Sequence, residues 1–386
     1  MDAFSFLFFT LRRGNVYASS HLDETAFIIN LKQYPMRKIL TIILGMLGLN
    51  ALSACMSSNF ENQEVGTFAE LVKQKDVILV DVRTAEEYAE EHIPGAVNID
   101  VKKDDFMAQV GKLIDKTKTI AVYCRSGRRS ANAAEMMEKQ GYKPVNLKGG
   151  ILAWKAEKMP VNTVEVDAFM TPGGKTVTFC ALIHASIRIC FDGMEIEVDP
   201  VRQLRERTVD YSVYPKADYI FVTHEHGDHF NKETIQQLSD SKTQLYTNQR
   251  CADMLGYGNV MGNGQQTETT SGFKVEAVPA YNNTEGHLQF HPKGRDNGYV
   301  ITLDGLRIYI AGDTEDIEEM ASIKDIDIAF LPCNQPYTMT TSQLVKAARM
   351  VKPKVLFPYH YGETDLTGVG DELRKDGIEV RIRHYE

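Results

Sequence analysis

The stretch THEHGDH, residues 223–229, places three histidines and two carboxylates within six consecutive residues. It follows the apolar residues 219–222, which are typical of a buried strand, so the histidines are expected on a loop at a strand end. Crowding of these side chains is unfavourable unless a metal ion compensates it. Imidazole and carboxylate groups are ligands for Zn²⁺, with Mn²⁺ and Fe²⁺ as alternatives. The stretch therefore predicts a metal site.

The spacing within this loop separates two sets of ligands. His224 and His226 are two residues apart, and a loop can direct both imidazoles to one ion. Asp228 and His229 come at the next turn of the chain and can bind a second ion. We therefore expect a site for two ions, with Zn²⁺ as the preferred metal.

Further candidate ligands follow at the ends of later apolar segments. Asp313 ends the segment of residues 307–313, and His360 ends the segment of residues 355–360. Both segments are typical of strands, so both side chains are expected at strand ends. We include Asp313 and His360 in the predicted metal site.

The order of these residues, HxHxDH followed by a histidine, an aspartate and a last histidine, resembles the metallo-β-lactamase superfamily over residues 176–386. Three short motifs resemble its metal-dependent hydrolase branch, which includes L-ascorbate-6-phosphate lactonase. They are His184-Ala-Ser, Asp199-Pro and PYHYG at residues 358–362. In this family two sheets with flanking helices hold the metals at one edge. We therefore expect an αββα sandwich for residues 176–386.

Carried over by motif, the resemblance implies the metal ligands His224, His226, Asp228, His229, His360 and a bridging Asp313. The third histidine of the first site has two candidates, because Tyr281-Asn-Asn stands where the family often has it. We favour His291, which leads directly into the next strand, over His287. If neither binds, the site holds one ion only. His184 is expected to face the substrate or to support the ligands rather than to bind metal.

The chemistry of such a site is hydrolysis. Two cations lower the pKa of a bridging water, supply hydroxide at neutral pH and polarise a carbonyl or phosphoryl oxygen. Asp228 or Asp313 orients the water, and we take Asp228 as the catalytic carboxylate. Glu225 is either a solvent-facing residue or a support for the ligands. The predicted substrate is a small molecule with a lactone, ester or phosphoester bond.

A second candidate site, AVYCRSGRRS at residues 121–130, crowds three arginines around one cysteine. Cys124 lies between an apolar strand and a helix, where unpaired backbone N–H groups favour an anion. The helix end and the guanidinium groups are both expected to lower the thiol pKa, so we expect a thiolate. The predicted anion-binding residues are Arg125, Ser126, Gly127, Arg128 and Arg129.

Strands alternate with helices around this cysteine, which indicates a parallel α/β sheet. Four motifs in this region resemble a rhodanese domain: DVRTAEEY at 81–88, HIPGAVNI at 92–99, CRSGRRS at 124–130 and GGILAW at 149–154. The resemblance implies a rhodanese-like α/β domain in which Cys124 is the catalytic residue and carries a persulfide. Asp81, Arg83 and His92 are expected to support the fold.

The segment before this domain is typical of an export signal. Met36-Arg-Lys is followed by the apolar residues 39–49 and by Leu52-Ser-Ala-Cys55. The last four residues resemble the bacterial lipobox. We expect a lipoprotein signal peptide over residues 36–54 and lipidation of Cys55. That would anchor the protein to a bacterial membrane in the cell envelope, outside the cytoplasm. A plain secreted protein is the alternative.

These features divide the chain of 386 residues into five parts. We expect translation to begin at Met36, so that residues 1–35 are an upstream extension outside the protein. The remaining parts are the signal peptide, the rhodanese-like domain over residues 55–162, a linker over 163–175 and the sandwich domain over 176–386. The net charge of −9 argues against nucleic acid as a partner. The six cysteines include no CxxC pair and so indicate neither a disulfide framework nor a zinc ribbon.

Three functions are consistent with these features. The first is an exported enzyme that joins a metal-dependent hydrolase to a sulfurtransferase. The second is a persulfide dioxygenase with one Fe²⁺, because that activity also joins these two folds. In the third, the rhodanese-like module only binds or senses a partner while the hydrolase is active.

Overall fold

The computed structural model describes residues 8–12, 15–20, 23–30 and 60–385. The first three of these ranges form an antiparallel sheet of β1 (Phe8–Arg12), β2 (Asn15–Ser20) and β3 (Asp23–Asn30), for which the sequence predicts no element. The predicted signal peptide over residues 36–54 and Cys55 lie outside the described residues and stay predictions. Within the described part of the chain, no helix is long and apolar enough to cross a membrane.

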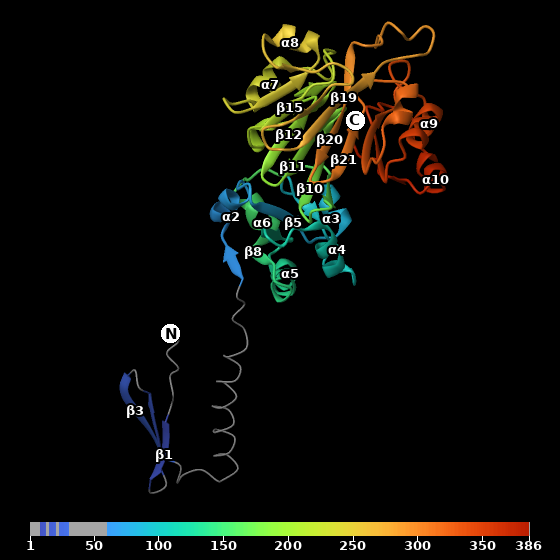
Figure 1. Cartoon of the computed structure of the whole chain (residues 1–386). Helices are drawn as coiled ribbons and strands as arrows, with labels where there is room; N and C mark the ends of the chain where they lie inside the picture. Colours follow the sequence, from blue (N-terminus) through green and yellow to red (C-terminus); the bar gives the residue numbers. More distant parts are fainter. Residues whose placement is uncertain (1–7, 13–14, 21–22, 31–59, 386) are drawn as a thin grey trace. The chain divides into compact units, whose positions relative to one another are not determined.

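The rhodanese-like domain is built on five parallel strands in the order β4-β8-β7-β5-β6 (Figure 1). The strands are β4 (Glu61–Gln63), β5 (Val77–Asp81), β6 (Val97–Asn98), β7 (Thr119–Tyr123) and β8 (Lys143–Leu147). The helices are α2 (Val65–Leu71), α3 (Ala85–Glu90), α4 (Phe106–Leu113), α5 (Arg128–Lys139) and α6 (Gly150–Ala156).

Helices cover both faces of this sheet, because successive side chains of a strand point to opposite faces. In β5, Val80 belongs to a core cluster with Phe106 of α4 and Ala133 of α5. The preceding residue, Leu79, belongs to the other cluster, which contains Phe68 of α2 and Trp154 of α6. The domain is therefore a parallel α/β sheet buried on two sides, as predicted.

The second domain contains two mixed sheets of seven strands each. The first, in the order β17-β16-β15-β12-β11-β10-β9, contains β9 (Val166–Met170), β10 (Thr176–Ile183), β11 (Ser186–Phe191), β12 (Met194–Val198), β15 (Tyr219–Phe221), β16 (Gln244–Thr247) and β17 (Asn259–Val260). The second, in the order β18 to β24, contains β18 (Gln266–Glu268), β19 (Lys274–Ala280), β20 (Asp296–Leu303), β21 (Leu306–Ile310), β22 (Ile328–Pro332), β23 (Val355–Tyr359) and β24 (Glu379–Val380).

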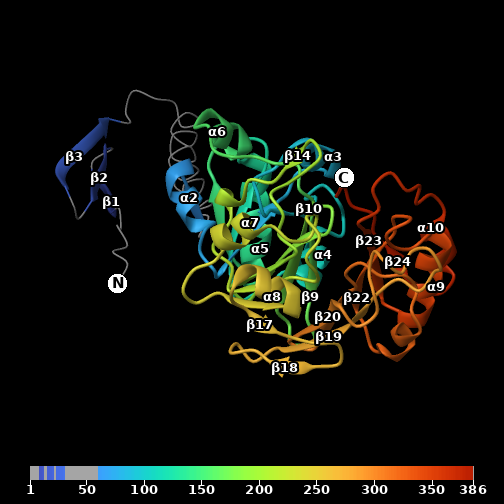
Figure 2. The ribbon, with the colours of Figure 1, turned by 90° about the horizontal axis from the view of Figure 1, so that it is seen from above.

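Shorter elements complete this domain. They are the ribbon β13 (Gln203–Leu204) and β14 (Arg207–Thr208), the 3₁₀ turns η2 (Tyr211–Val213) and η3 (Glu318–Ser322), and the helices α7 (Lys232–Leu238), α8 (Gln249–Leu255), α9 (Thr341–Val351) and α10 (Val369–Arg374). The pair α7 and α8, in yellow, lies well apart from the pair α9 and α10, in red, in both views (Figures 1 and 2).

Three apolar layers hold the sandwich together. The central layer joins the two sheets through side chains such as Phe221 and Phe330. A second layer packs the first sheet against α7 and α8, for example Val222 with Ile235. A third layer packs the second sheet against α9 and α10, as with Leu344. This layering confirms the predicted αββα fold.

The stretch of residues 163–175, predicted as a linker, differs from the prediction. It contains β9, which pairs antiparallel with β10 and forms an edge of the first sheet. The chain therefore enters the sandwich before Thr176. An edge strand of five residues has little pattern of its own, so only its pairing with β10 reveals it.

Candidate metal centre

The metal-ligand candidates lie at the ends of strands from both sheets. In the first sheet, His184 follows β10, and the loop that starts at His224 follows β15. In the second sheet, Asp313 follows β21 and His360 follows β23. The sandwich thus brings together side chains that are far apart in the sequence.

The first ligand group consists of His224, His226 and His291. Their ligand atoms all lie within 4.8 Å of one another, and Nε2 of His224 is 3.0 Å from Nδ1 of His226. His224 and His291 are buried, while His226 is partly exposed. Three converging imidazoles provide nitrogen ligands for one Zn²⁺-type ion.

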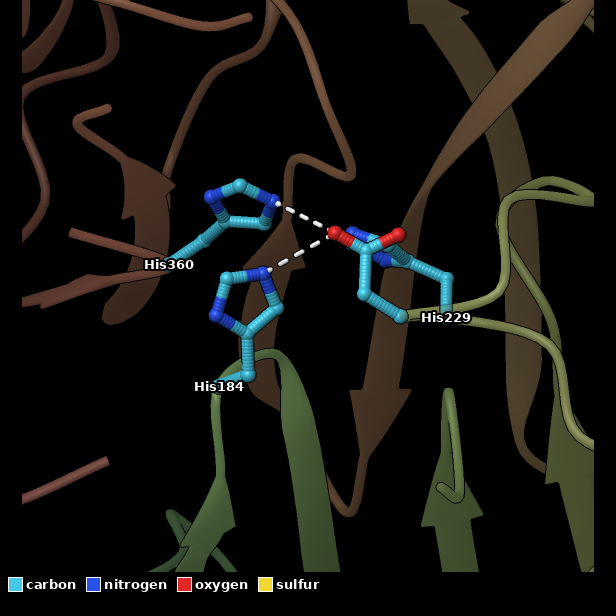
Figure 3. Close-up of side chains that lie close together, drawn as sticks. His184, His229 and His360 are labelled. Carbon is cyan, nitrogen blue, oxygen red and sulfur yellow. Dashed lines mark hydrogen bonds and ion pairs between the residues drawn. The ribbon is translucent and has the colours of Figure 1, made fainter. Parts of the chain in front are cut away.

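The second ligand group consists of His184, Asp228, His229 and His360, again with ligand atoms within 4.8 Å of one another. Nε2 of His184 is 3.2 Å from Oδ2 of Asp228, and Nε2 of His360 is 3.6 Å from the same oxygen. Figure 3 shows the rings of His184 and His360 turned toward one carboxylate, with His229 beside it. Asp228 is partly exposed, so solvent and substrate can reach this side.

Asp313 joins the two groups. Its Oδ2 lies 3.4 Å from Nε2 of His291 in the first group and 3.2 Å from Nε2 of His360 in the second. Its Oδ1 lies 3.2 Å from Nε2 of His229. A carboxylate in this place can share its two oxygens between two cations.

The donor atoms fit a metal. Nε2 of His229, Oδ1 of Asp313 and Nε2 of His360 are buried without a hydrogen-bond partner. Buried polar atoms are normally hydrogen-bonded, because leaving them unpaired costs stability. A cation among them would satisfy all three, and imidazole nitrogens with carboxylate oxygens suit Zn²⁺, Mn²⁺ or Fe²⁺.

The charges of the centre are strongly coupled. Burial disfavours the charged form of Asp313, yet the nearby His229 and His360 outweigh it and hold the pKa of Asp313 well below its usual range. Burial acts in the same way on His360, but Asp313 and Asp228 raise its pKa to about 9. Burial and the neighbouring His229 lower the pKa of His224. The single buried carboxylate of Asp313 thus interacts with several imidazoles. This arrangement is suited to binding an added cation.

Two buried carboxylates orient ligand histidines by contacting the Nδ1 atoms of their rings. Asp199 lies 2.8 Å from Nδ1 of His229 and also accepts hydrogen bonds from the backbone and hydroxyl of Thr223. Asp296 lies 3.1 Å from Nδ1 of His291. Such carboxylates fix the tautomer and the orientation of a ligating imidazole. The sequence predicts no role for Asp296, because nothing in its spacing relates it to His291.

The structure distinguishes the two candidates for the third histidine. His291 lies in the first ligand group, whereas Nδ1 of His287 lies 3.1 Å from the buried Glu315. Glu315 also accepts the backbone N–H groups of Asn283 and Thr284, at 2.7 and 2.6 Å, so His287 belongs to a loop contact. The structure thus brings together every predicted ligand.

His184 is placed differently from the prediction. It was expected to face the substrate or to support the ligands, but its Nε2 lies among the atoms of the second ligand group. Its position at the end of β10, opposite His360, comes from the packing of the two sheets, which no local spacing reveals. The only sequence signal was the His184-Ala-Ser motif.

The second candidate site surrounds Cys124. This residue follows β7, and its loop leads through Gly127, with φ of 84°, into α5. Its thiol is buried and accepts a hydrogen bond from the hydroxyl of Ser130, with 3.4 Å between Oγ and Sγ. Burial would raise the pKa of the thiol, but the Ser130 hydroxyl and the backbone N–H groups of Ser130, Ser126 and Gly127 outweigh it, so the pKa is lowered.

The arginines of this loop differ in their placement from the prediction. Arg125 and Arg128 are exposed. Arg129 forms a bidentate ion pair with Glu87, with both contacts at 2.7 Å. The lowered pKa of Cys124 therefore depends mainly on a hydroxyl and on the backbone amides at the helix end, and the latter agree with the prediction. Of the three guanidinium groups, which were expected to contribute as well, Arg129 also interacts with Cys124. The pairing of Arg129 with a residue of α3 could not be read from the loop sequence.

The predicted supports of the fold are buried. Nη2 of Arg83 lies 2.6 Å from Oδ2 of Asp81, and both side chains are almost inaccessible to solvent. The ring nitrogens of His92 lie 2.8 Å from the carbonyl of Tyr88 and 2.6 Å from that of Val164. These contacts hold the loops that surround the sheet.

Comparisons with known proteins identify the two domains that carry these sites. A model of the rhodanese-like domain matches residues 64–157, and a model of the beta-lactamase superfamily domain matches residues 176–360. The chain is similar to a UPF0173 metal-dependent hydrolase from Archaeoglobus fulgidus, with 30% identity over 183 residues that cover 43% of this chain and 78% of that protein. It is also similar to one from Nanoarchaeum equitans, with 33% identity over 154 residues that cover 38% and 71%.

A solved structure adds to this result. The crystal structure of a protein from Parabacteroides distasonis, assigned as a metal-dependent hydrolase, is 51% identical, with a TM-score of 0.56. The match covers 58% of this chain and 100% of that chain. Because the chain covers more than two thirds of relatives that are at least 30% identical, it belongs to the UPF0173 family of metal-dependent hydrolases, with a metallo-β-lactamase fold and a rhodanese-like domain in front of it.

Proposed function

We propose that the C-terminal domain is a two-ion hydrolase, with Zn²⁺ as its preferred metal, that cleaves a lactone, ester or phosphoester bond of a small molecule. The observation that carries this proposal is the position of Asp313 between two complete ligand groups. His224, His226 and His291 would hold one ion, and His184, Asp228, His229 and His360 the other. Bound ions of this kind lower the pKa of water and polarise the oxygen of a substrate.

The residues of the chain have distinct parts in this chemistry. His226 and Asp228 are the partly exposed ligands and so mark the side from which substrate enters. Asp228 orients the attacking water, because its carboxylate is the accessible one. Asp199 and Asp296, both buried, keep the rings of His229 and His291 in place. Catalysis then depends on ligands held rigidly before substrate arrives.

The rhodanese-like domain is proposed to transfer sulfur. The Cys124 thiolate attacks the outer sulfur of a donor such as thiosulfate, the S–S bond breaks, and sulfite leaves with the electron pair. An acceptor such as cyanide then attacks the outer sulfur of the persulfide and releases thiocyanate and the thiolate. The lowered pKa of Cys124 and the amides of its loop support this proposal.

The division of the candidate residues into two centres favours two separate activities over a coupled persulfide dioxygenase, because the metal ligands form two groups in one domain and Cys124 lies in the other. The domains are in contact where Thr176 Oγ1 donates to the carbonyl of Leu113, and where Lys118 lies 2.8 Å from Asp192. Strand β10 starts at Thr176 and runs for eight residues to His184, a span of about 26 Å. Strand β7 likewise starts next to Lys118, and Cys124 follows its last residue. The domains also meet where the ring of His92 lies 2.6 Å from the carbonyl of Val164.

The sequence before the rhodanese-like domain leads to a proposal of localisation. We propose that Cys55 carries lipid and anchors the protein to a bacterial membrane outside the cytoplasm, on the basis of its signal-like sequence. Cys55→Ala is expected to release the protein from membranes. Membranes are fractionated and washed with high salt, and a variant that still sediments with them would contradict lipid attachment.

The hydrolase proposal is tested by metal content and activity together. The purified protein is expected to hold two equivalents of Zn²⁺ and to cleave at least one class in a screen of lactones, phosphodiesters and esters. His291→Ala is expected to lose one ion, whereas the matched His287→Ala keeps both, because His287 contacts Glu315 instead. One iron per chain with oxygen uptake on glutathione persulfide would favour the dioxygenase and overturn the proposal.

A further inference from the structure

We propose that Arg295 is a positioning residue that holds the first ligand group, His224, His226 and His291, in a geometry ready for metal. This inference deepens the proposed function, because it rests on the two-ion site. Arg295 is not a ligand candidate itself. Its guanidinium contacts the two separate segments that supply the histidines of this group.

The strongest contact of Arg295 is a pair of parallel hydrogen bonds, a fork, to the Asp296 carboxylate. Nε of Arg295 lies 2.7 Å from Oδ1 of Asp296, and Nη2 lies 2.8 Å from Oδ2. Asp296 is fully buried and its Oδ2 lies 3.1 Å from Nδ1 of His291. The paired hydrogen bonds fix the plane of the carboxylate, and the carboxylate in turn fixes the imidazole ring.

The same guanidinium holds the chain on the other side of His291. Nη2 of Arg295 donates to the carbonyl of Phe290 at 2.8 Å. Phe290 precedes His291 and Asp296 follows it by five residues, so Arg295 closes this loop around the ligand. The backbone N–H of Asn282 also donates to the carbonyl of His291 at 2.8 Å. The loop therefore holds His291 through both backbone and side-chain contacts.

Glu225 connects Arg295 to the other ligand segment. It stands between His224 and His226, and its Oε1 lies 3.5 Å from Nη1 of Arg295. The Glu225 side chain is 8% exposed and that of Arg295 is 18% exposed, so solvent screens this pair only partly. Glu225 is thus a support for the ligands rather than a solvent-facing residue, which resolves the two roles considered for it. Arg295 joins the segment of His224 and His226 to the loop of His291.

Lysine cannot replace arginine in this role. A guanidinium is planar and offers donors in a rigid fork, whereas a lysine ammonium is a single point of charge on a flexible stem. Arg295→Lys keeps the positive charge but loses the fork to Asp296. It therefore separates a requirement for geometry from a requirement for charge.

The test uses Co²⁺ as a probe of the metal-free protein, followed by visible absorption. The wild-type protein is expected to bind two equivalents. In Arg295→Lys, one of the two ions is expected to bind roughly 10–100-fold more weakly, as for other residues that orient metal ligands. The matched control is Arg250→Gln. Arg250 also contacts Glu225, at 3.1 Å, but has no contact with Asp296 among the described ion pairs and is expected to behave as wild type.

Each outcome has a defined meaning. Wild-type affinity for both ions in Arg295→Lys, or equal loss of both ions with the fold intact, overturns the role of Arg295. If Arg295→Lys fails to fold, Glu225→Gln replaces it, because that change weakens the link between the segments and keeps the fork. Unchanged Co²⁺ binding in Glu225→Gln then overturns the role. A wild-type protein with one Co²⁺ contradicts the two-ion function, and Arg295 is then supported only if Arg295→Lys weakens that ion.

Discussion

The rings of His184 and His360 lie with their centroids 3.7 Å apart, and the backbone N–H of His360 donates to the carbonyl of His184 at 3.2 Å. Both residues have positive φ, 54° and 48° respectively. This conformation is uncommon for residues with a side chain, and it is found where surrounding contacts hold a functional site in place. The two sheets of the sandwich thus meet through a pair of strained histidines at the second ligand group.

This relationship predicts that His184 is needed for the second ion. His184→Asn is expected to lower the affinity for one of two Zn²⁺ ions by about 10–100-fold and to reduce hydrolysis in parallel. Asparagine tolerates positive φ, so the change removes the imidazole with little effect on the backbone. Metal content after dialysis against a chelator measures the loss.

The matched control for this prediction is His384→Asn. The His384 side chain is 87% exposed, contacts Glu165 and belongs to neither ligand group. It is expected to keep two ions and full activity. Retention of both ions by His184→Asn as well would leave His184 with no part in the centre.

The sequence was sufficient to predict ligands that lie close together along the chain. Four members of the centre, His224, His226, Asp228 and His229, stand in one loop, where spacing alone indicates metal chemistry. His184 and Asp296 come from other strand ends. They are brought near these ligands only by the packing of the two sheets, so no pattern of spacing could assign them.

The same limit explains why some predictions differ from the structure. The loop after Cys124 shows three arginines, but its sequence gives no sign that Arg129 is paired with Glu87 of another helix. The strand β9 was predicted as linker because pairing with β10 defines it. Both fold classes were predictable because their motifs are long and ordered, whereas partners across the fold were not.

The buried pair of Asp81 and Arg83 predicts a large effect on stability. Asp81→Asn leaves the guanidinium buried without its counter-charge, and the rhodanese-like domain is expected to lose about 3–5 kcal/mol. Trp154 is the only tryptophan of the sequence and is buried in this domain, so its fluorescence during urea unfolding reports on this domain. The control is Glu135→Gln, which breaks an exposed pair with Lys139 and is expected to cost less than about 1 kcal/mol. Equal effects of the two changes would contradict a structural role for the pair.

The lowered pKa of Cys124 predicts a thiol that reacts at lower pH than an ordinary cysteine. Burial opposes the shift, but the Ser130 hydroxyl and the backbone N–H groups of the loop lower the folded-state pKa from the ordinary value of a cysteine thiol. The group therefore contributes stability that is present above that value and is lost as pH falls through the folded-state pKa. Alkylation by iodoacetamide, followed by peptide mass spectrometry, is expected to proceed at a lower pH than for the unfolded chain. Burial raises the pKa of Cys180 to about 11 and that of Cys251 to about 12, so these thiols serve as internal references.

Two variants separate the causes of this shift. Ser130→Ala removes the hydroxyl that donates to Cys124 and is expected to move the alkylation profile to higher pH. Arg128→Gln changes an exposed side chain and is expected to leave the profile nearly unchanged. If the alkylation profile shifts in Arg128→Gln and stays unchanged in Ser130→Ala, the guanidinium groups are the main cause of the lowered pKa of Cys124.

A substitution that inactivates one centre is expected to leave the activity of the other centre intact. His226→Ala takes one imidazole from the first ligand group, where Nδ1 of His226 lies 3.0 Å from Nε2 of His224. It is expected to lower metal stoichiometry and to abolish hydrolysis. Sulfur transfer from thiosulfate to cyanide is expected to persist, because the Cys124 thiol is stabilised by its own loop and by Ser130. Cys124→Ser is expected to give the reverse pattern, with sulfur transfer lost and metal content unchanged.

Measurement of both activities and of metal content on the two purified variants decides between separate and coupled centres. A conformational signal between the centres would have to cross the contact between the domains, where Thr176 Oγ1 donates to the carbonyl of Leu113 and the ring of His92 lies 2.6 Å from the carbonyl of Val164. Loss of sulfur transfer in His226→Ala with the first domain still folded, as judged by Trp154 fluorescence, would mean that the centres are coupled, and would favour a persulfide-oxidising enzyme over two separate activities.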